Sequence, residues 1–209
     1  MSALLFHPHP PRNPYQEMLY ALCPNAGIEP RRLRDLSRLN DEPIAGDAVL
    51  LHLHWTHTIL RDAQTGAEAE ARLGRFGDTL DRFIAHGGRL LWTVHNVLPH
   101  EARFPELEAK VCQAIADRAS AVHVMCEATV AATAPWYEIP KDRLAVIPHA
   151  SYLGVYPNSV ARGEARARLG LGRDHTVLTV FGTVRRYKGL DRLLDAFEAV
   201  HPGSTTCDW

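Results

Sequence analysis

Short apolar runs alternate with amphipathic segments along most of the chain. The runs "ALLF" (3–6) and "AVLLHLHW" (48–55) are short, apolar and bounded by turn residues, which is typical of buried strands. The same pattern predicts strands within 89–96, 121–125, 144–148 and 176–182. Because these runs are almost continuously apolar, we expect both faces of the sheet to be covered.

Between the runs, apolar residues recur at helical spacing. One predicted helical face carries Leu73, Phe76, Leu80 and Ile84. The glycines of "HGG" (86–88) supply a stop for that helix. Further helices are predicted over 107–115, 161–169 and 190–197. Strands that alternate with helices predict an α/β fold with a Rossmann-like, doubly wound and mostly parallel sheet, in which ligands bind at the carboxyl ends of the strands.

One segment predicts a domain boundary. The stretch "SYLGVYPNSVARG" (151–163) contains turn formers and has no clear period, and a helix, a strand and a second helix follow it. We therefore expect a first Rossmann-like domain over 1–155. The range 156–209 is expected to be a linker and the opening of an incomplete second Rossmann-like domain, so the chain is predicted to be truncated.

Composition limits the classes of partner and the compartment. The formal net charge is −1 and charged residues make up 22%, so no global field favours nucleic acid. The four cysteines are widely spaced without a CxxC pair, which favours a reducing, cytoplasmic setting. There is no signal-peptide pattern, and no run of about 18 apolar residues is present. We expect a cytoplasmic protein without a membrane span.

The stretch "LHLHWTH" (51–57) places three histidines within seven residues. It resembles the HxHxDH signature of metallo-hydrolases, but Thr56 stands where the carboxylate ligand belongs. One hypothesis is therefore a metal-dependent hydrolase that uses His52, His54 and His57. The alternative, which we favour, is that these histidines are packed or hydrogen-bonded parts of a strand end and that no metal is bound.

A basic turn precedes the last predicted helix. In "VLTVFGTVRRYKGLDRLLDAF" (177–197), an apolar run leads to Gly182, and Arg185 and Lys188 follow before Gly189 opens the helix. Helix N-termini carry unpaired N–H groups and partial positive charge, so this combination suits a diphosphate. A solvated basic turn is the alternative. Neither a Walker P-loop nor the GxGxxG fingerprint is present.

This turn resembles the opening of the second domain in retaining glycosyltransferases of the GT-B fold, family 4 or group 1 type. The similarity rests on "FG" (181–182), on "KG" (188–189) and on a following helix with an acidic residue and leucines. The first part of the chain agrees in "LLWTVHNVLPHE", "AVHVMCEAT" and "LAVIPHASY". Thr183 replaces the arginine that many members have, which favours Arg185 as the partner of Lys188. The family's acidic donor-binding motif would lie beyond residue 209.

The resemblance implies a hexosyltransferase of polysaccharide biosynthesis that transfers a sugar from a UDP- or GDP-linked donor to a saccharide or lipid-linked acceptor with retention. It implies no permanently bound cofactor and no metal. The catalytic residues would be His95, Arg185 and Lys188, of which His95 hydrogen-bonds the donor sugar. The nucleotide-sugar site would include Gly182, Arg185, Lys188 and Gly189.

Acceptor-side residues are also implied, namely Asn13, Tyr15, His57, Asn96, Glu101 and His149. The Arg-rich stretch 31–39 could contact the anionic inner surface of a membrane, although such segments are more often simply solvated. A third hypothesis is a noncatalytic module that binds a saccharide or a partner. We expect the 209-residue chain alone to be weakly active or inactive.

Overall fold

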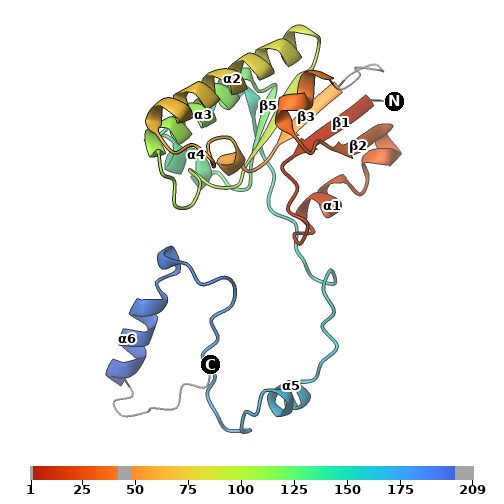
Figure 1. Ribbon diagram of the computed structural model, residues 1–209. Coiled ribbons are helices and arrows are strands. Elements are labelled where there is room, and N and C mark those ends of the chain that lie inside the picture. Colours follow the sequence, from red (N-terminus) through yellow and green to blue (C-terminus); the bar gives the residue numbers. More distant parts are fainter. Residues whose placement is uncertain (1, 42–48, 201–209) are drawn as a thin grey trace. The chain divides into compact units, whose positions relative to one another are not determined.

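The computed structural model describes residues 2–41 and 49–200. Residue 48, the first of the predicted strand 48–55, and the polar tail from residue 201 lie outside the described residues. The chain divides into two compact units, Met1–Val155 and Tyr156–Trp209. The sheet and the larger helices belong to the first unit (Figure 1).

The first unit is built on a six-stranded sheet in the order β2-β1-β3-β4-β5-β6. Its strands are β1 (Ser2–His7), β2 (Ile28–Arg32), β3 (Val49–Leu53), β4 (Arg89–Val94), β5 (Ala121–Val124) and β6 (Leu144–Val146). Every neighbouring pair is parallel. The strand order reverses direction between β1 and β3, as it does in doubly wound folds. The α/β prediction is confirmed.

Helices connect the parallel strands. They are α1 (Tyr15–Tyr20), α2 (Gly66–Ala85), α3 (Pro105–Arg118) and α4 (Ala128–Thr133), with the 3-10 turns η1 (Cys23–Ala26), η2 (Leu36–Asp41), η3 (Thr56–Thr58) and η4 (Lys141–Arg143). The long helix α2 begins where the Thr65 side chain accepts a hydrogen bond from the Glu68 N–H at 3.2 Å. Helices α2 and α3 pack together and cover one face of the sheet (Figure 1).

The two faces of the sheet differ in chemistry, because side chains alternate along each strand. The face toward α2 and α3 is apolar, and Leu51, Trp92 and Val122 on it are at most 1% exposed. The opposite face carries His52 on β3 and Thr93 on β4, with His123 on β5 directly beside Thr93. A row of polar side chains therefore crosses β3, β4 and β5, although the sequence of these three strands is almost continuously apolar.

One edge strand was not predicted. Strand β2 (Ile28–Arg32) contains Pro30 and two arginines, a composition that is unusual inside a sheet. It pairs with β1 alone, so its outer edge faces away from the ladder and tolerates these residues. The Arg-rich segment 31–39 thus begins as a strand and continues into η2.

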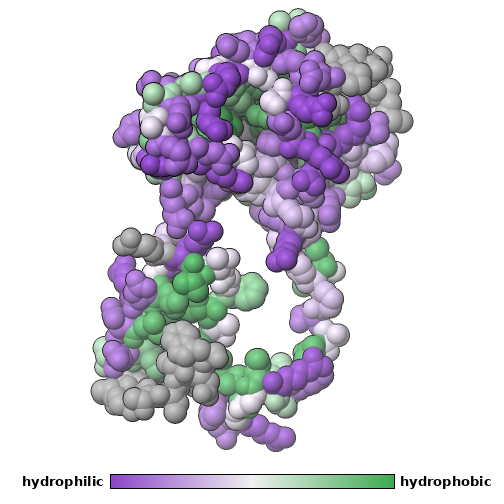
Figure 2. Space-filling model, in the orientation of Figure 1, coloured by the Kyte–Doolittle hydropathy of each residue, from purple (hydrophilic) through white to green (hydrophobic). Residues whose placement is uncertain are grey.

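The second unit contains α5 (Arg162–Arg168), the turn η5 (Arg186–Lys188) and α6 (Leu190–Val200). The strand predicted over 176–182 is wrong: this range is irregular, and Phe181 is 93% exposed. A strand needs a neighbour for its backbone groups, and the described residues of this unit form no strand. Apolar side chains, Leu178 among them, therefore remain at the surface of the unit. Figure 2 shows hydrophobic atoms, in green, on the surface of this unit.

Within the described residues, no helix combines the length and the apolar character that crossing a membrane requires.

Replacement of Gly88 by alanine should destabilise the first unit by about 1–3 kcal/mol. Gly88 connects α2 to β4, and a Cβ at this position would lie 2.4 Å from two ring carbons of Phe83. Phe83 is 1% exposed, so its ring has no space into which it could move. The free energy of unfolding, measured by denaturant titration with circular dichroism, tests this prediction.

Gly74→Ala is the matched control. Gly74 lies on the exposed side of α2, and an added Cβ would meet no atom within 4 Å. Alanine is favoured over glycine inside a helix by about 1 kcal/mol, so this variant should be more stable than the parent. Equal effects in the two variants would contradict the packing explanation for Gly88.

Candidate functional site

The carboxyl ends of β1, β3 and β4 meet where the strand order reverses. His7 ends β1, and its carbonyl accepts a hydrogen bond from the backbone N–H of His54 at 2.9 Å. His95 directly follows β4. Open α/β sheets bind ligands in the crevice at this kind of switch point, because the loops on either side leave in opposite directions.

The polar row on the sheet is joined by hydrogen bonds. His52 Nε2 lies 2.8 Å from Thr93 Oγ1, and Thr93 Oγ1 lies 3.0 Å from His123 Nδ1. At the end of the row, His123 Nε2 donates to the carbonyl of Ile147 at 2.8 Å. Thr93 is fully buried, so the row crosses the sheet without contact with solvent at its centre.

Helix α1 connects this row to the strand ends. The Tyr20 hydroxyl lies 2.8 Å from His52 Nδ1 and 2.6 Å from His54 Nε2. His54 Nδ1 in turn lies 3.1 Å from His95 Nε2. We call the six side chains His52, His54, His95, His123, Tyr20 and Thr93 the histidine network.

Aromatic rings surround His95. The Trp55 ring stacks on the His95 ring with centroids 4.0 Å apart and an interplanar angle of 15°. The edge of Tyr15 approaches the same imidazole at 5.0 Å, and His149 lies 5.2 Å from the Tyr15 ring. The loops after β3 and β4 thus present flat, rigid rings close to the switch point, a surface suited to a ring-shaped ligand.

Burial determines the charge of the network. Loss of hydration, reinforced by neighbouring imidazoles, lowers the pKa of both His52 and His95 to about 3. The same causes lower the pKa of His54 still further. These three rings are therefore neutral near pH 7 and act through directional hydrogen bonds rather than through charge.

A cavity of about 570 Å³ opens beside the network at the same edge of the sheet. Its lining includes His7, Asn13, Arg32, Arg34, Trp55, His57 and Arg61. The lining contains three arginines and no carboxylate, and within the described residues none of these arginines forms an ion pair. Unpaired guanidinium groups in a concave site favour anionic ligands.

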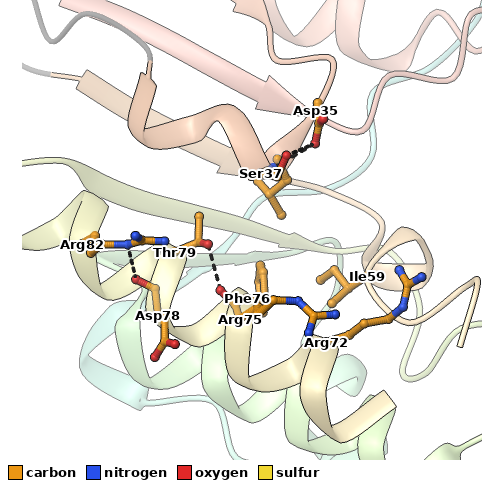
Figure 3. A pocket seen from close by; sticks show the side chains of 10 residues that line it. Asp35, Ser37, Ile59, Arg72, Arg75, Phe76, Asp78, Thr79 and Arg82 are labelled. Atoms are coloured by element: carbon orange, nitrogen blue, oxygen red, sulfur yellow. Dashed lines mark hydrogen bonds between the residues drawn. The ribbon is translucent and has the colours of Figure 1, made fainter. Parts of the chain in front are cut away.

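A second cavity, of about 400 Å³, lies along α2 and is also lined by arginines (Figure 3). Here carboxylates accompany the basic groups, because Asp35 and Asp78 belong to the lining. Arg72 lies 4.0 Å from Asp62, and the Asp35 carboxylate accepts a hydrogen bond from the Ser37 hydroxyl at 2.8 Å. Because two aspartates offset most of the charge of three arginines there, this cavity is a weaker candidate for an anion site than the cavity at the strand ends.

The structure brings several predicted acceptor-side residues together in the first unit. Asn13 Oδ1 accepts hydrogen bonds from the Tyr15 N–H at 3.0 Å and from the Tyr152 hydroxyl at 3.1 Å. His57, on η3, lines the strand-end cavity together with Asn13. His149 joins through its contact with the Tyr15 ring.

Two predicted residues lie in the loop that follows β4. Asn96 directly follows His95, and no hydrogen bond joins its side chain to the network within the described residues. Glu101 has a φ of 57° and lies further along the loop toward α3. The loop thus starts at the network and leads away from it.

The predicted donor residues share one turn of the second unit. Gly182 and Gly189 have φ values of 109° and 65°, which favour glycine. The Lys188 N–H donates to the Arg185 carbonyl at 3.0 Å. The ammonium group of Lys188 lies against Gly182, since a Cβ on Gly182 would be 2.6 Å from Lys188 Nζ. This turn leads directly into α6.

Sequence reasoning missed Tyr20, Thr93, His123 and Trp55. Thr93 and His123 are polar residues within apolar runs, at positions that share a sheet face with His52 only when the strand register is known. Tyr20 carries no such signal. Its place in the network depends on how α1 packs on the sheet.

The geometry does not support the metal-hydrolase hypothesis. Both ring nitrogens of His52 and of His54 already take part in hydrogen bonds. His57 is exposed on η3. In the part of the chain that the structure describes, no three histidine, cysteine or acidic side chains are arranged to hold a metal ion.

The unfolding free energy of the first unit should fall as the pH is lowered below about 6.5. His52 and His95 have a pKa of about 3 in the folded state, against 6.5 for an unperturbed histidine. Between these values the unfolded chain binds more protons than the folded one. Each such histidine then removes about 1.4 kcal/mol of stability per pH unit. Denaturant titrations between about pH 8 and pH 5 measure the slope.

Glu108 opposes this effect and supplies a second variant. Burial raises the pKa of Glu108 to about 7 from 4.5, so the folded state gains a proton as the pH falls through this window. Glu108→Gln removes that contribution and should make the loss of stability with falling pH steeper. A free energy of unfolding that stays constant down to about pH 5 in both proteins would disprove the neutral state of the buried rings.

Comparison with known proteins supports the fold. No family model and no curated protein matches the sequence. Among solved structures, that of Anabaena HepE in complex with UDP and glucose is similar, with a TM-score of 0.57 and 16% sequence identity. The similarity covers 95% of this chain and 58% of HepE, so the chain spans less than two thirds of that protein's length. At this identity the likeness establishes a shared parallel α/β fold.

Proposed function

We propose that this chain is part of a retaining glycosyltransferase of the GT-B fold that transfers a sugar from a nucleotide-diphosphate donor. The observation that carries the proposal is the fold likeness to HepE, whose solved structure holds UDP and glucose. We assign residues 1–155 to the acceptor-side domain. We assign residues 156–209 to the start of the nucleotide-sugar domain.

The basic turn before α6 is the proposed donor site. Departure of a nucleoside diphosphate places negative charge on phosphate oxygens, which fixed cationic donors stabilise. Lys188 and Arg185 supply such groups, and the N-terminus of α6 adds backbone N–H groups. Gly189 leaves space for a diphosphate to approach the backbone, since no atom lies within 4 Å of the position that a Cβ would take there. UDP and GDP offer the same diphosphate chemistry, and both are proposed donors.

His95 is the proposed contact to the donor sugar. A neutral imidazole can hydrogen-bond a sugar hydroxyl, and the stacked Trp55 ring offers a flat face beside it. The network holds the His95 ring in place through His54, which favours a fixed orientation of the bound sugar. We propose that His95 orients the sugar and that the cationic groups stabilise the leaving group.

The strand-end cavity is the proposed acceptor site. Asn13 and His57 can hydrogen-bond a saccharide, while Arg32, Arg34 and Arg61 suit an anionic group such as the phosphate of a lipid-linked acceptor. We also propose Tyr15, Asn96, Glu101 and His149 as contacts on this side. A lipid-linked acceptor would bring the Arg-rich segment to the inner face of a membrane.

Lys188→Ala should weaken binding of UDP and GDP by about tenfold to one hundredfold. A hydrogen bond to a charged group contributes about 1.5–3 kcal/mol, which corresponds to this range. Isothermal titration calorimetry with each nucleotide measures the change. Gly182→Ala should have a similar effect while it keeps the charge, because the new methyl group would displace the Lys188 ammonium.

Lys110→Ala is the matched control, since it removes the same side chain from the exposed surface of α3. This variant should bind both nucleotides as the parent does. The proposed donor site is wrong if neither nucleotide binds the parent. It is also wrong if Lys110→Ala weakens binding as much as Lys188→Ala, because general charge attraction would then explain the affinity.

A further inference from the structure

The direction of each hydrogen bond in the histidine network follows from elementary chemistry. The Ile147 carbonyl can only accept, so the nearby Nε2 of His123 carries a proton. With a single proton, on Nε2, His123 has an unprotonated Nδ1, which accepts from the Thr93 hydroxyl at 3.0 Å. The end of the network on β5 thus determines which way Thr93 donates.

The direction of the next two bonds, from β4 to β3 and on to α1, follows from Thr93. Thr93 has a single proton, which His123 receives, so its oxygen accepts from His52 Nε2–H at 2.8 Å. Because His52 is neutral, its Nδ1 accepts from the Tyr20 hydroxyl at 2.8 Å.

Tyr20 determines the direction of the hydrogen bonds at the strand ends. Its only proton goes to His52, so its oxygen accepts from His54 Nε2–H at 2.6 Å. His54 is also neutral, and its Nδ1 accepts from His95 Nε2–H at 3.1 Å. In every bond of the network, the group nearer to His95 therefore donates to the group nearer to His123. The neutral His95 ring is left with an unprotonated Nδ1.

We propose that the histidine network is a one-way hydrogen-bond relay that fixes the tautomer of His95 and can carry one proton between His95 and His123. In its resting state the relay holds the proton of His95 on Nε2, so that Nδ1 acts only as a hydrogen-bond acceptor. His52, Tyr20, His54 and Thr93 are positioning residues for His95. This inference rests on the hydrogen-bond geometry and does not depend on the proposed transferase activity.

Proton transfer along the relay balances at every step. A proton that binds His95 Nδ1 lets the Nε2 proton move to His54 Nδ1, and the Nε2 proton of His54 then moves to the Tyr20 oxygen. Tyr20 releases its original proton to His52 Nδ1. The Nε2 proton of His52 moves to Thr93, which releases its own to His123 Nδ1. One positive charge ends on His123, and each inner group keeps one proton at its other position.

The relay determines which ligand groups His95 can bind. In the resting state Nδ1 accepts from a hydroxyl or an N–H group and cannot donate to a carbonyl or an anionic oxygen. After uptake of one proton, the tautomers reverse and His95 presents an N–H instead. A sugar hydroxyl fits the resting state.

The surroundings favour the resting state at neutral pH. The groups that act on the charges of His52, His54 and His95 are other histidines, including His7 on β1 and His149 after β6. No carboxylate is among these groups to offset an added proton. The groups that face the network from α1 are Tyr15 and Tyr20, both neutral phenols.

Nitrogen-15 NMR of the imidazoles tests the tautomers directly in the full chain at neutral pH. We expect His52, His54, His95 and His123 each to carry the proton on Nε2 and to have an unprotonated Nδ1. A proton on Nδ1 of His52, His54 or His95 in the parent protein would overturn the proposal. This readout needs neither a ligand nor a variant.

Thr93→Val tests the coupling between the ends, because valine keeps the shape and removes the hydroxyl. In the parent, a proton on His123 Nδ1 should be accompanied by a switch of His52 and His54 from Nε2–H to Nδ1–H. In Thr93→Val, His123 should gain that proton while His52 and His54 keep their tautomers. The same switch in both proteins would show that Thr93 carries no proton and would overturn the relay.

Two further variants distinguish the loss of the Thr93 hydroxyl from a general change in structure. Thr93→Ser restores the hydroxyl and should restore the coupled switch. Thr133→Val removes the hydroxyl of another buried threonine, on α4, whose partner is the Val130 carbonyl, and should leave the coupling unchanged. Loss of coupling in Thr133→Val would contradict the assignment to Thr93.

Discussion

The structure of the first unit depends on the requirement that every buried imidazole nitrogen has a hydrogen-bond partner. His54 is 1% exposed and Thr93 is fully buried, so an unmet donor or acceptor there would cost about 1–3 kcal/mol. The strands alone cannot meet this requirement. Tyr20 connects His52 to His54, which ties the short helix α1 to the sheet and fixes the loop that begins after β1.

The apolar face of the sheet makes this polar row possible. The packing of Leu51, Trp92 and Val122 against α2 and α3 fixes the register of β3, β4 and β5. A slip of one residue would exchange the two faces and place histidines in the apolar core. The same packing therefore fixes both the fold and the alignment of the network, so the two cannot vary independently.

The sequence predicted the elements whose patterns are local, and it failed where the outcome depends on neighbours. Strands β1 and β3 are short apolar runs and were predicted, whereas β2 was missed because an edge strand tolerates proline and arginine. The range 176–182 looks like a strand but has none to pair with among the described residues of its unit. His95 was nominated from its place after an apolar run. Thr93 could not be predicted as a site residue, because its hydrogen-bond partners depend on the strand register and on the packing of α1.

The two kinds of polar group at the strand ends divide the site by charge. The rings of His54 and His95 stay neutral because loss of hydration and neighbouring imidazoles lower the pKa of both, whereas exposed arginines line the strand-end cavity beside them. A ligand with an uncharged, hydroxyl-rich ring and an anionic end would satisfy both parts, whereas a wholly anionic ligand would find no donor at the resting His95. This division favours such a mixed ligand over a simple anion.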